Sequence, residues 1–387
     1  MSVWLDVVGQ PAAVTEFEAA AAAAAGHGPA LGMTHAWLIT GPPGSGRSTA
    51  AVSFAASLVC PHEGCGDCVA CRSVLSGSHA DVTVVRSTTL SHGKEQTKSL
   101  VMDAAGNPVT APWRIMIIED ADRLTEAAAN TLLKAIEEPA ERTVWVLCAP
   151  STEDLLPTIR SRTRHVALRV PPPGAVAELL EREGVDPAMA SFAAHASQGH
   201  IGRARALATD EHTRSRRAEI LKVPRLMTGI SDAYGMAHDL RKVAEEDAKR
   251  RTADLDEREN AAMLAAYGQG AEGVSAAKVK SLAGRSLSEM AKTQTQRASR
   301  SVRDELDRYF VDFLGFYRDV LAIQLGTSQA LINVDMRPAI EQAAQTSDPV
   351  DTMKRIDAIA AARSQLASNV PPALVCESLM VQLLHPV

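Results

Sequence analysis

Several features are scarce in this sequence, and each scarcity argues against a class of protein. Aromatic residues make up only 4% of the chain, which argues against a sheet whose main task is base stacking. No apolar run approaches the roughly 20 residues of a membrane-spanning helix, and the seven alanines of residues 19–25 suit a helix interior. Lysine and arginine number 40 against 46 acidic residues, so any nucleic-acid contact must come from a local basic patch.

The start of the chain also lacks the features of an exported protein. It has no basic segment followed by an apolar stretch, so no secretory signal is predicted. We therefore expect a cytoplasmic protein with no membrane partner. Its six cysteines are then expected to be reduced thiols or metal ligands and not a disulfide framework.

The residues that are present indicate a multidomain protein that begins with an α/β domain. A chain of 387 residues that is 46% hydrophobic and 22% charged can build two or three globular domains. Five short segments rich in apolar and β-branched residues alternate with helix-like stretches. Several are apolar at consecutive positions, which is typical of a parallel sheet covered on both faces. The predicted strands are residues 36–40, 81–86, 114–118, 143–149 and 165–170.

A proline-rich segment, Pro171-Pro172-Pro173-Gly174, ends this alternation and is typical of a domain edge. We predict a parallel-sheet α/β domain over 1–170, a small helical domain over 171–212 and a helical C-terminal domain over 213–387. An apolar stripe at helical spacing is expected in the core of the last domain. It consists of Leu306, Phe310, Phe313, Leu314, Tyr317, Val320, Leu321 and Leu325.

A glycine-rich loop follows the first predicted strand and precedes a helix-prone run. Such a loop can point backbone N–H groups at a phosphate, and the helix dipole adds to the attraction. The pattern matches G-x-x-x-x-G-K-[ST] except that Arg47 replaces the lysine. Arginine keeps the charge but not the compact geometry. The loop therefore predicts a nucleotide-binding-type fold, leaves ATP binding open and argues against fast hydrolysis. The candidate phosphate-binding residues are Gly41, Gly44, Ser45, Gly46, Arg47, Ser48 and Thr49, with the Ser48 hydroxyl placed to hold Mg²⁺.

Two acids at the end of the third predicted strand form a second candidate motif. Glu119 and Asp120 follow the apolar run 115–118, as in a Walker-B segment. ATPases of this kind usually end the strand Asp-Glu, so here each carboxylate is displaced by about one methylene, and small misplacements can cost ~100-fold in rate. The alternative is a pair of surface acids at a strand end.

Four cysteines within twelve residues predict a metal site. Cys60, Cys65, Cys68 and Cys71 have the spacing C-x₄-C-x₂-C-x₂-C, and zinc takes four thiolates tetrahedrally. Because four protein ligands leave no open position, the zinc is expected to be structural. Isolated buried thiols are the alternative.

Together with the loop and the cysteines, two strings carry a family resemblance. Residues 126–139 (EAAANTLLKAIEEP) and 155–162 (LLPTIRSR) closely resemble the bacterial DNA polymerase III clamp-loader subunits of the AAA+ class, over about the first 210 residues. The resemblance implies an AAA+ domain, a helical lid, a helical collar and membership of a DNA-directed DNA polymerase complex, a nucleotidyltransferase.

The resemblance also implies a role for Arg162. In the motor subunits of this family, the arginine of a Ser-Arg-Cys motif reaches the γ-phosphate in a neighbouring subunit, and Arg162 lies in Ser161-Arg162-Thr163. Arg47, the order Glu119-Asp120 and Arg203, one place late after Gly199, depart from the motor pattern. These departures favour the family's subunit with a weakened site. The implied partners are gamma/tau and delta subunits, the sliding clamp and primed DNA, and Lys134 becomes a candidate phosphate contact.

Two other functions remain open from the residues alone. One is an autonomous motor ATPase that tolerates Arg47. The other is a zinc-stabilised DNA-binding module that uses the basic stretch 274–303, where seven basic residues face the single acid Glu289. The alternative for that stretch is an exposed basic helix face without a partner.

Overall fold

The computed structural model describes residues 2–29, 32–86, 94–268 and 276–385, and of residues 276–278 the backbone alone. Residues 274 and 275 and the Lys278 side chain of the predicted basic stretch therefore lie outside the described part. The chain divides into two compact units at Asp210 and Glu211, which are described separately. No helix among the described residues combines the length and the apolar character needed to cross a bilayer.

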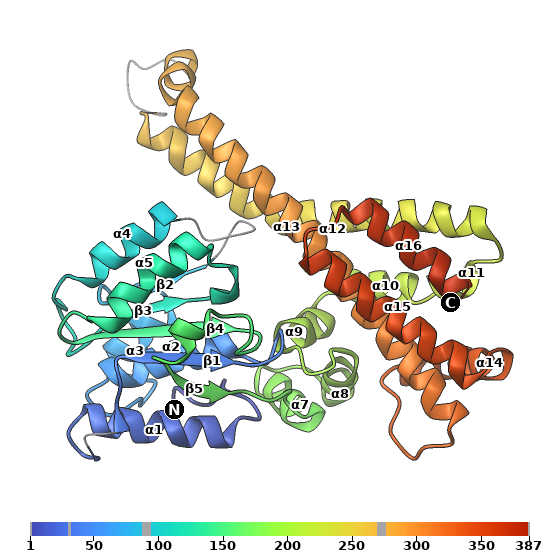
Figure 1. The fold of residues 1–387 in the computed structure, drawn as a ribbon, viewed down its shortest axis with the longest axis horizontal. Helices are drawn as coiled ribbons and strands as arrows, with labels where there is room; N and C mark the ends of the chain where they lie inside the picture. Colours follow the sequence, from blue (N-terminus) through green and yellow to red (C-terminus); the bar gives the residue numbers. More distant parts are fainter. Residues whose placement is uncertain (1, 30–31, 87–93, 269–275, 386–387) are drawn as a thin grey trace. The chain divides into compact units, whose positions relative to one another are not determined.

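A five-stranded parallel sheet forms the centre of the first unit, as predicted (Figure 1). Its strand order is β2-β3-β4-β1-β5. The strands are β1 (Ala36–Thr40), β2 (Val82–Val85), β3 (Arg114–Ile118), β4 (Thr143–Ala149) and β5 (Arg164–Ala167). The last strand was predicted to reach residue 170 but ends at Ala167. Beyond it, the N–H of Arg169 donates to the Gln10 side chain at 2.9 Å and not to a neighbouring strand.

Helices cover both faces of this sheet because strand side chains point alternately to the two sides. On one face Trp37 packs against Phe17 and Phe54, with ring centroids 6.0 and 4.9 Å away. On the other face Leu38 and Trp145 pack under a second set of helices. The helices of the two faces are α1 (Pro11–Ala24), α2 (Arg47–Val59) and α3 (Val69–Leu75), and then α4 (Lys94–Ala104), α5 (Glu126–Glu137) and α6 (Pro157–Arg160), with the 3₁₀ turn η2 (Ala121–Arg123) before α5.

A small helical group with its own core completes the first unit. Val176, Leu180 and Leu207 are buried in that core. The group consists of α7 (Pro173–Arg182), α8 (Pro187–Ala196) and α9 (Ile201–Thr209).

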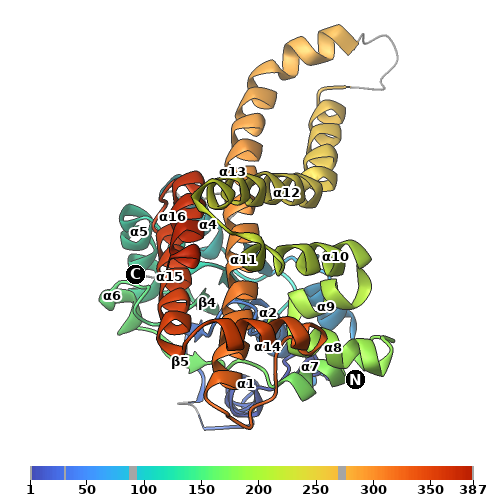
Figure 2. The same cartoon turned by 90° about the vertical axis from the view of Figure 1, so that its right-hand side faces the viewer.

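The described residues of the second unit are helical. Five residues of the predicted core stripe are buried, namely Leu306, Phe310, Phe313, Tyr317 and Val320. Leu314 and Leu321 are only partly buried, and Leu325 lies beyond the helix end and is 60% exposed. Helices α12 and α13 form a long hairpin (Figures 1 and 2). The elements are α10 (Glu211–Ile220), α11 (Val223–Leu226), α12 (Ile230–Ala266), α13 (Ala276–Gln324), η3 (Val334–Met336), α14 (Arg337–Thr346), α15 (Pro349–Ala367) and α16 (Pro372–Leu384).

Candidate functional site

The glycine-rich loop connects β1 to α2. Gly44 and Gly46 have φ angles of 81° and 94°, in the left-handed region that glycine adopts without strain. Gly46 is the N-cap of α2, and the first N–H groups of a helix have no intrahelical acceptor. The seven candidate phosphate-binding residues, 41, 44–48 and 49, thus lie in one loop and the first turn of one helix.

Groups of the chain itself occupy this loop. The Arg47 guanidinium donates a hydrogen bond back to the Gly41 carbonyl. From α9, the Ile201 N–H donates to the Gly44 carbonyl at 3.1 Å. The His200 ring lies so close to Gly44 that a Cβ there would be 2.2 Å from the ring Cγ. The sequence did not point to His200, because no local pattern predicts a contact across more than 150 residues.

The acidic pair lies at the end of β3, near the loop. Glu119 accepts from Arg86 Nε at 3.2 Å, and Asp120 has a φ of 54° at the start of η2. Burial raises the pKa of Asp122, and the Asp120 carboxylate adds to the rise. Asp122 Oδ1 is buried without a hydrogen-bond partner among the described residues. Asp122 was not a predicted site residue, although its place two residues after Asp120 could have suggested it.

The four cysteines converge as their spacing predicts. Their sulfur atoms all lie within 4.8 Å of one another, and Cys60 Sγ is 3.6 Å from Cys65 Sγ and 3.7 Å from Cys68 Sγ. A tetrahedron with metal–sulfur bonds of about 2.3 Å has edges of about 3.8 Å, so the donor set fits zinc. Burial opposes ionisation of Cys60, but backbone hydrogen bonds from residues 62, 64 and 65 lower its pKa to about 6. Cys68 caps α3, which fixes two ligands on one short helix.

Arg162 lies on the turn after α6 with its guanidinium partly accessible. Its Nε is 2.8 Å from Glu137 Oε1 at the end of α5, and its side chain is 41% exposed. Its NH1 donates to the Thr158 carbonyl at 2.9 Å. These two contacts hold the side chain in one orientation. Glu137 is a site residue that the sequence did not reveal, since its partner is distant in the chain. Lys134, on the same helix, is exposed.

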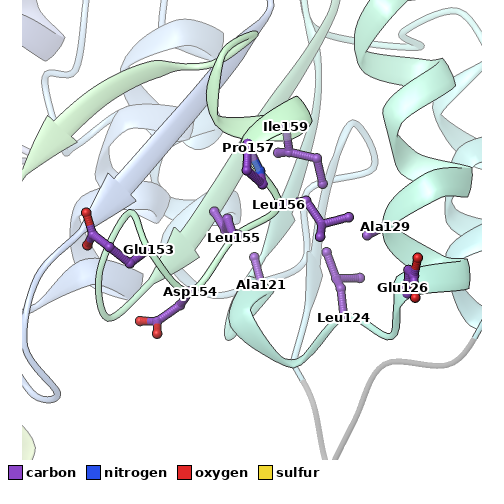
Figure 3. A pocket seen from close by; sticks show the side chains of 10 residues that line it. All are labelled: Ala121, Leu124, Glu126, Ala129, Glu153, Asp154, Leu155, Leu156, Pro157 and Ile159. Carbon is purple, nitrogen blue, oxygen red and sulfur yellow. The ribbon is translucent and has the colours of Figure 1, made fainter.

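A separate pocket of about 330 Å³ lies between the start of α5 and the segment that joins β4 to α6 (Figure 3). Leucine, isoleucine and alanine side chains form its walls, and three carboxylates stand around it. Acidic groups repel phosphate, so this pocket does not fit a nucleotide's phosphates. Its lining residues are Ala121, Leu124, Glu126, Ala129, Glu153, Asp154, Leu155, Leu156, Pro157 and Ile159.

Comparison with known proteins shows what the chain is similar to. Residues 25–172 match the sequence family described as "DNA polymerase III, delta subunit". The chain is 27% identical over 355 residues to DNA polymerase III subunit delta' of Bacillus subtilis, which covers 91% of each protein. It is 34% identical over 151 residues to subunit delta' of Pseudomonas aeruginosa, covering 38% of this chain and 45% of that one.

Subunits of the gamma/tau type are also similar, over a shorter segment. DNA polymerase III subunit gamma/tau of Mycobacterium tuberculosis is 36% identical over 162 residues, 40% of this chain. The match spans only 28% of that protein's length. Among solved structures, a gamma subunit-related protein of Thermotoga maritima has a TM-score of 0.37 at 14% identity, covering 90% of this chain and 94% of that one. The family model and the matches to delta' subunits confirm the predicted resemblance to DNA polymerase III clamp-loader subunits.

Proposed function

We propose that this chain, a clamp-loader protein of the delta-prime type, assists ATP-dependent loading of a sliding clamp onto primed DNA by serving the ATP site of a neighbouring subunit. In this proposal Arg162 is the arginine finger supplied in trans. The partners are gamma/tau and delta subunits, the clamp and, within the complex, primed DNA. Such a finger neutralises charge as the phosphoryl group leaves and is worth about 10³ to 10⁵ in rate.

One observation carries the proposal: the two candidate arginines are held differently. The Arg47 guanidinium donates a hydrogen bond to the backbone of its own loop. The Arg162 guanidinium contacts Glu137 and the Thr158 carbonyl, and the side chain remains 41% exposed. A cation that must reach another subunit needs access and a fixed direction, and Arg162 has both.

The chain's own phosphate loop is proposed to turn over ATP slowly or not at all. Arg47 replaces a compact point charge with a planar fork, and Glu119 and Asp120 stand in the reverse of the usual order. Should ATP bind, the loop residues would contact its phosphates and Ser48 would hold Mg²⁺. A magnesium–nucleotide complex would supply the scissile γ-phosphate; the protein residues would only position it.

The four cysteines are proposed to hold a structural zinc. They would fix the segment 60–71 between α2 and α3, and closed four-thiolate sites leave no position for water. The zinc therefore takes no part in the proposed hydrolysis.

The proposal is tested by replacing Arg162 in a reconstituted loader. Arg162→Ala should strongly reduce ATP turnover stimulated by clamp and primed DNA, because one site loses its trans cation. Arg160→Ala is the matched control, since Arg160 is exposed at the end of α6, two residues before Arg162, and no role is proposed for it. Undiminished turnover with Arg162→Ala would remove the finger from the proposal. Brisk turnover by the isolated wild-type chain would favour the autonomous ATPase instead.

A further inference from the structure

The outer part of the α12–α13 hairpin has a charge pattern that the proposed function does not use. We call residues 249–268 and 279–303 the arm; its two helices contact each other, with Tyr267 Oη 2.7 Å from Ser286 Oγ (Figures 1 and 2). The α12 half has four basic and four acidic residues, whereas the α13 half has six basic residues and the single acid Glu289. The whole chain has a net charge of −6, so this half-helix is a local exception.

Half of these α13 cations serve the arm's own structure. Arg297 is nearly buried and donates to Asp256 at 2.7 Å and Glu259 at 2.6 Å across the hairpin. Arg300 lies 3.6 Å from Asp304, and Arg303 NH1 donates to the Ser299 carbonyl at 3.4 Å.

The other three cations, Lys280, Arg285 and Lys292, point to solvent. The Arg285 side chain is 94% exposed and only approaches Glu289 at 3.9 Å. Lys280 and Lys292 are exposed, and neither has an ion pair with a described residue. Three solvated charges without an internal role are available to a ligand.

Helical geometry aligns part of this charge along one face. Positions 7 residues apart are close to two whole turns, so the exposed side chains of Arg285 and Lys292 share a face and lie about 10 Å apart along the helix. Ser288, Gln296 and Ser299 lie on or beside that face. Lysine, arginine, serine and glutamine side chains are the groups that most often contact nucleic-acid phosphates.

We propose that this face of α13 binds the phosphate backbone of double-stranded DNA without reading its sequence. Protein interfaces are anchored by buried aromatic or apolar side chains, and between residues 285 and 303 no large apolar side chain is exposed. Single strands are held by stacking on aromatic rings, and that segment has no aromatic residue. Duplex DNA is a polyanion with regularly spaced charges that a protein can bind without stacking on its bases, and it therefore fits this face.

The chain offers a matched control on α12. Lys242 and Lys249 are also exposed and seven residues apart, but Glu245 and Glu246 lie between them on the same exposed surface. Neutralising this pair removes the same charge at the same spacing from a surface that is not predominantly basic. Glutamine is used in both pairs because it is a good helix former.

The test is a salt titration of the full-length chain with a fluorescent DNA duplex of about 20 base pairs. R285Q/K292Q should weaken binding at least about tenfold and lower the slope of log K against log salt by about 2. K242Q/K249Q should leave the duplex affinity and the salt slope unchanged. The wild type and both variants should give the same helical circular dichroism signal. R162A should bind duplex as the wild type does, which separates this inference from the arginine finger.

Three outcomes would overturn the inference. One is equal duplex binding by the wild type and R285Q/K292Q. Another is a wild-type chain that binds single strands better than duplex. The third is a wild-type chain that ignores duplex but binds poly-glutamate through Arg285 and Lys292, which would assign the face to an acidic protein.

Discussion

Asp81 provides the sharpest stability prediction, because its carboxylate is fully buried at the start of β2. It accepts hydrogen bonds from the N–H groups of Val109, Thr110 and Ala111 at 2.6, 2.7 and 2.9 Å, and from the Thr110 hydroxyl at 2.7 Å. Burial opposes ionisation, but these donors outweigh it and lower the pKa of Asp81 from 3.8 to about 2. The ionised carboxylate thereby fixes the segment that leads into β3.

The size of the effect follows from linkage between proton binding and folding. Because the pKa of Asp81 is about 2 units lower in the folded than in the unfolded state, its ionisation contributes up to about 2 kcal/mol to the free energy of unfolding. That stability is present above the unfolded pKa and is lost as the pH falls from about 4 to about 2. Asp81→Asn places an amide donor among four donors, so we expect the free energy of unfolding to fall by about 2–3 kcal/mol at neutral pH.

The assay is equilibrium unfolding in denaturant, followed by tryptophan fluorescence, for the wild type and Asp81→Asn. Trp113, two residues after Ala111, is close enough in the chain to report on this segment. We expect a lower midpoint for the variant at pH 7 and a difference that shrinks as the pH falls below about 4. Equal midpoints at pH 7, or an unchanged difference at low pH, would refute this reasoning.

Two further predictions concern the zinc module and the phosphate loop. Cys60→Ser should lower the zinc content below one equivalent and destabilise the segment between α2 and α3. Cys376→Ser, outside the module, should retain the metal. Elemental analysis and thermal unfolding check both variants, and full zinc content in Cys60→Ser would contradict the four-thiolate site. Gly44→Ala should lower the free energy of unfolding by about 1–3 kcal/mol, because φ is 81° there and the new Cβ would meet His200. Gly174→Ala, whose Cβ would meet nothing, should be nearly neutral. Equal unfolding midpoints for the two variants would contradict both the backbone strain and the packing of His200 on the loop.

Local patterns predicted the elements whose formation depends on nearby residues. The strands at 36–40, 114–118 and 143–149 have the predicted bounds, because apolar runs on consecutive positions identify strands buried on both faces. The cysteine spacing predicted a cluster because four thiols at short intervals are typical of a structural zinc site. The glycines of this segment predicted the loop between β1 and α2.

Contacts between distant residues could not be predicted in this way. The pairing of Arg162 with Glu137 and the packing of His200 on Gly44 both depend on how elements pack. The sequence analysis treated the basic stretch and the apolar stripe separately, yet residues 276–303 of the stretch and residues 306–321 of the stripe lie in α13, a single helix of 49 residues. Helix length is set by packing along the hairpin, which no short window of sequence reveals.

The most direct test of the central claim compares two arginine variants in the same reconstituted loader. ATP turnover stimulated by clamp and primed DNA is measured with Arg47→Ala and with Arg162→Ala. We expect Arg47→Ala to stay within about twofold of the wild type and Arg162→Ala to lose most of the stimulated rate. The reverse pattern, with turnover dependent on Arg47 and indifferent to Arg162, would mean that the chain works as a motor at its own site.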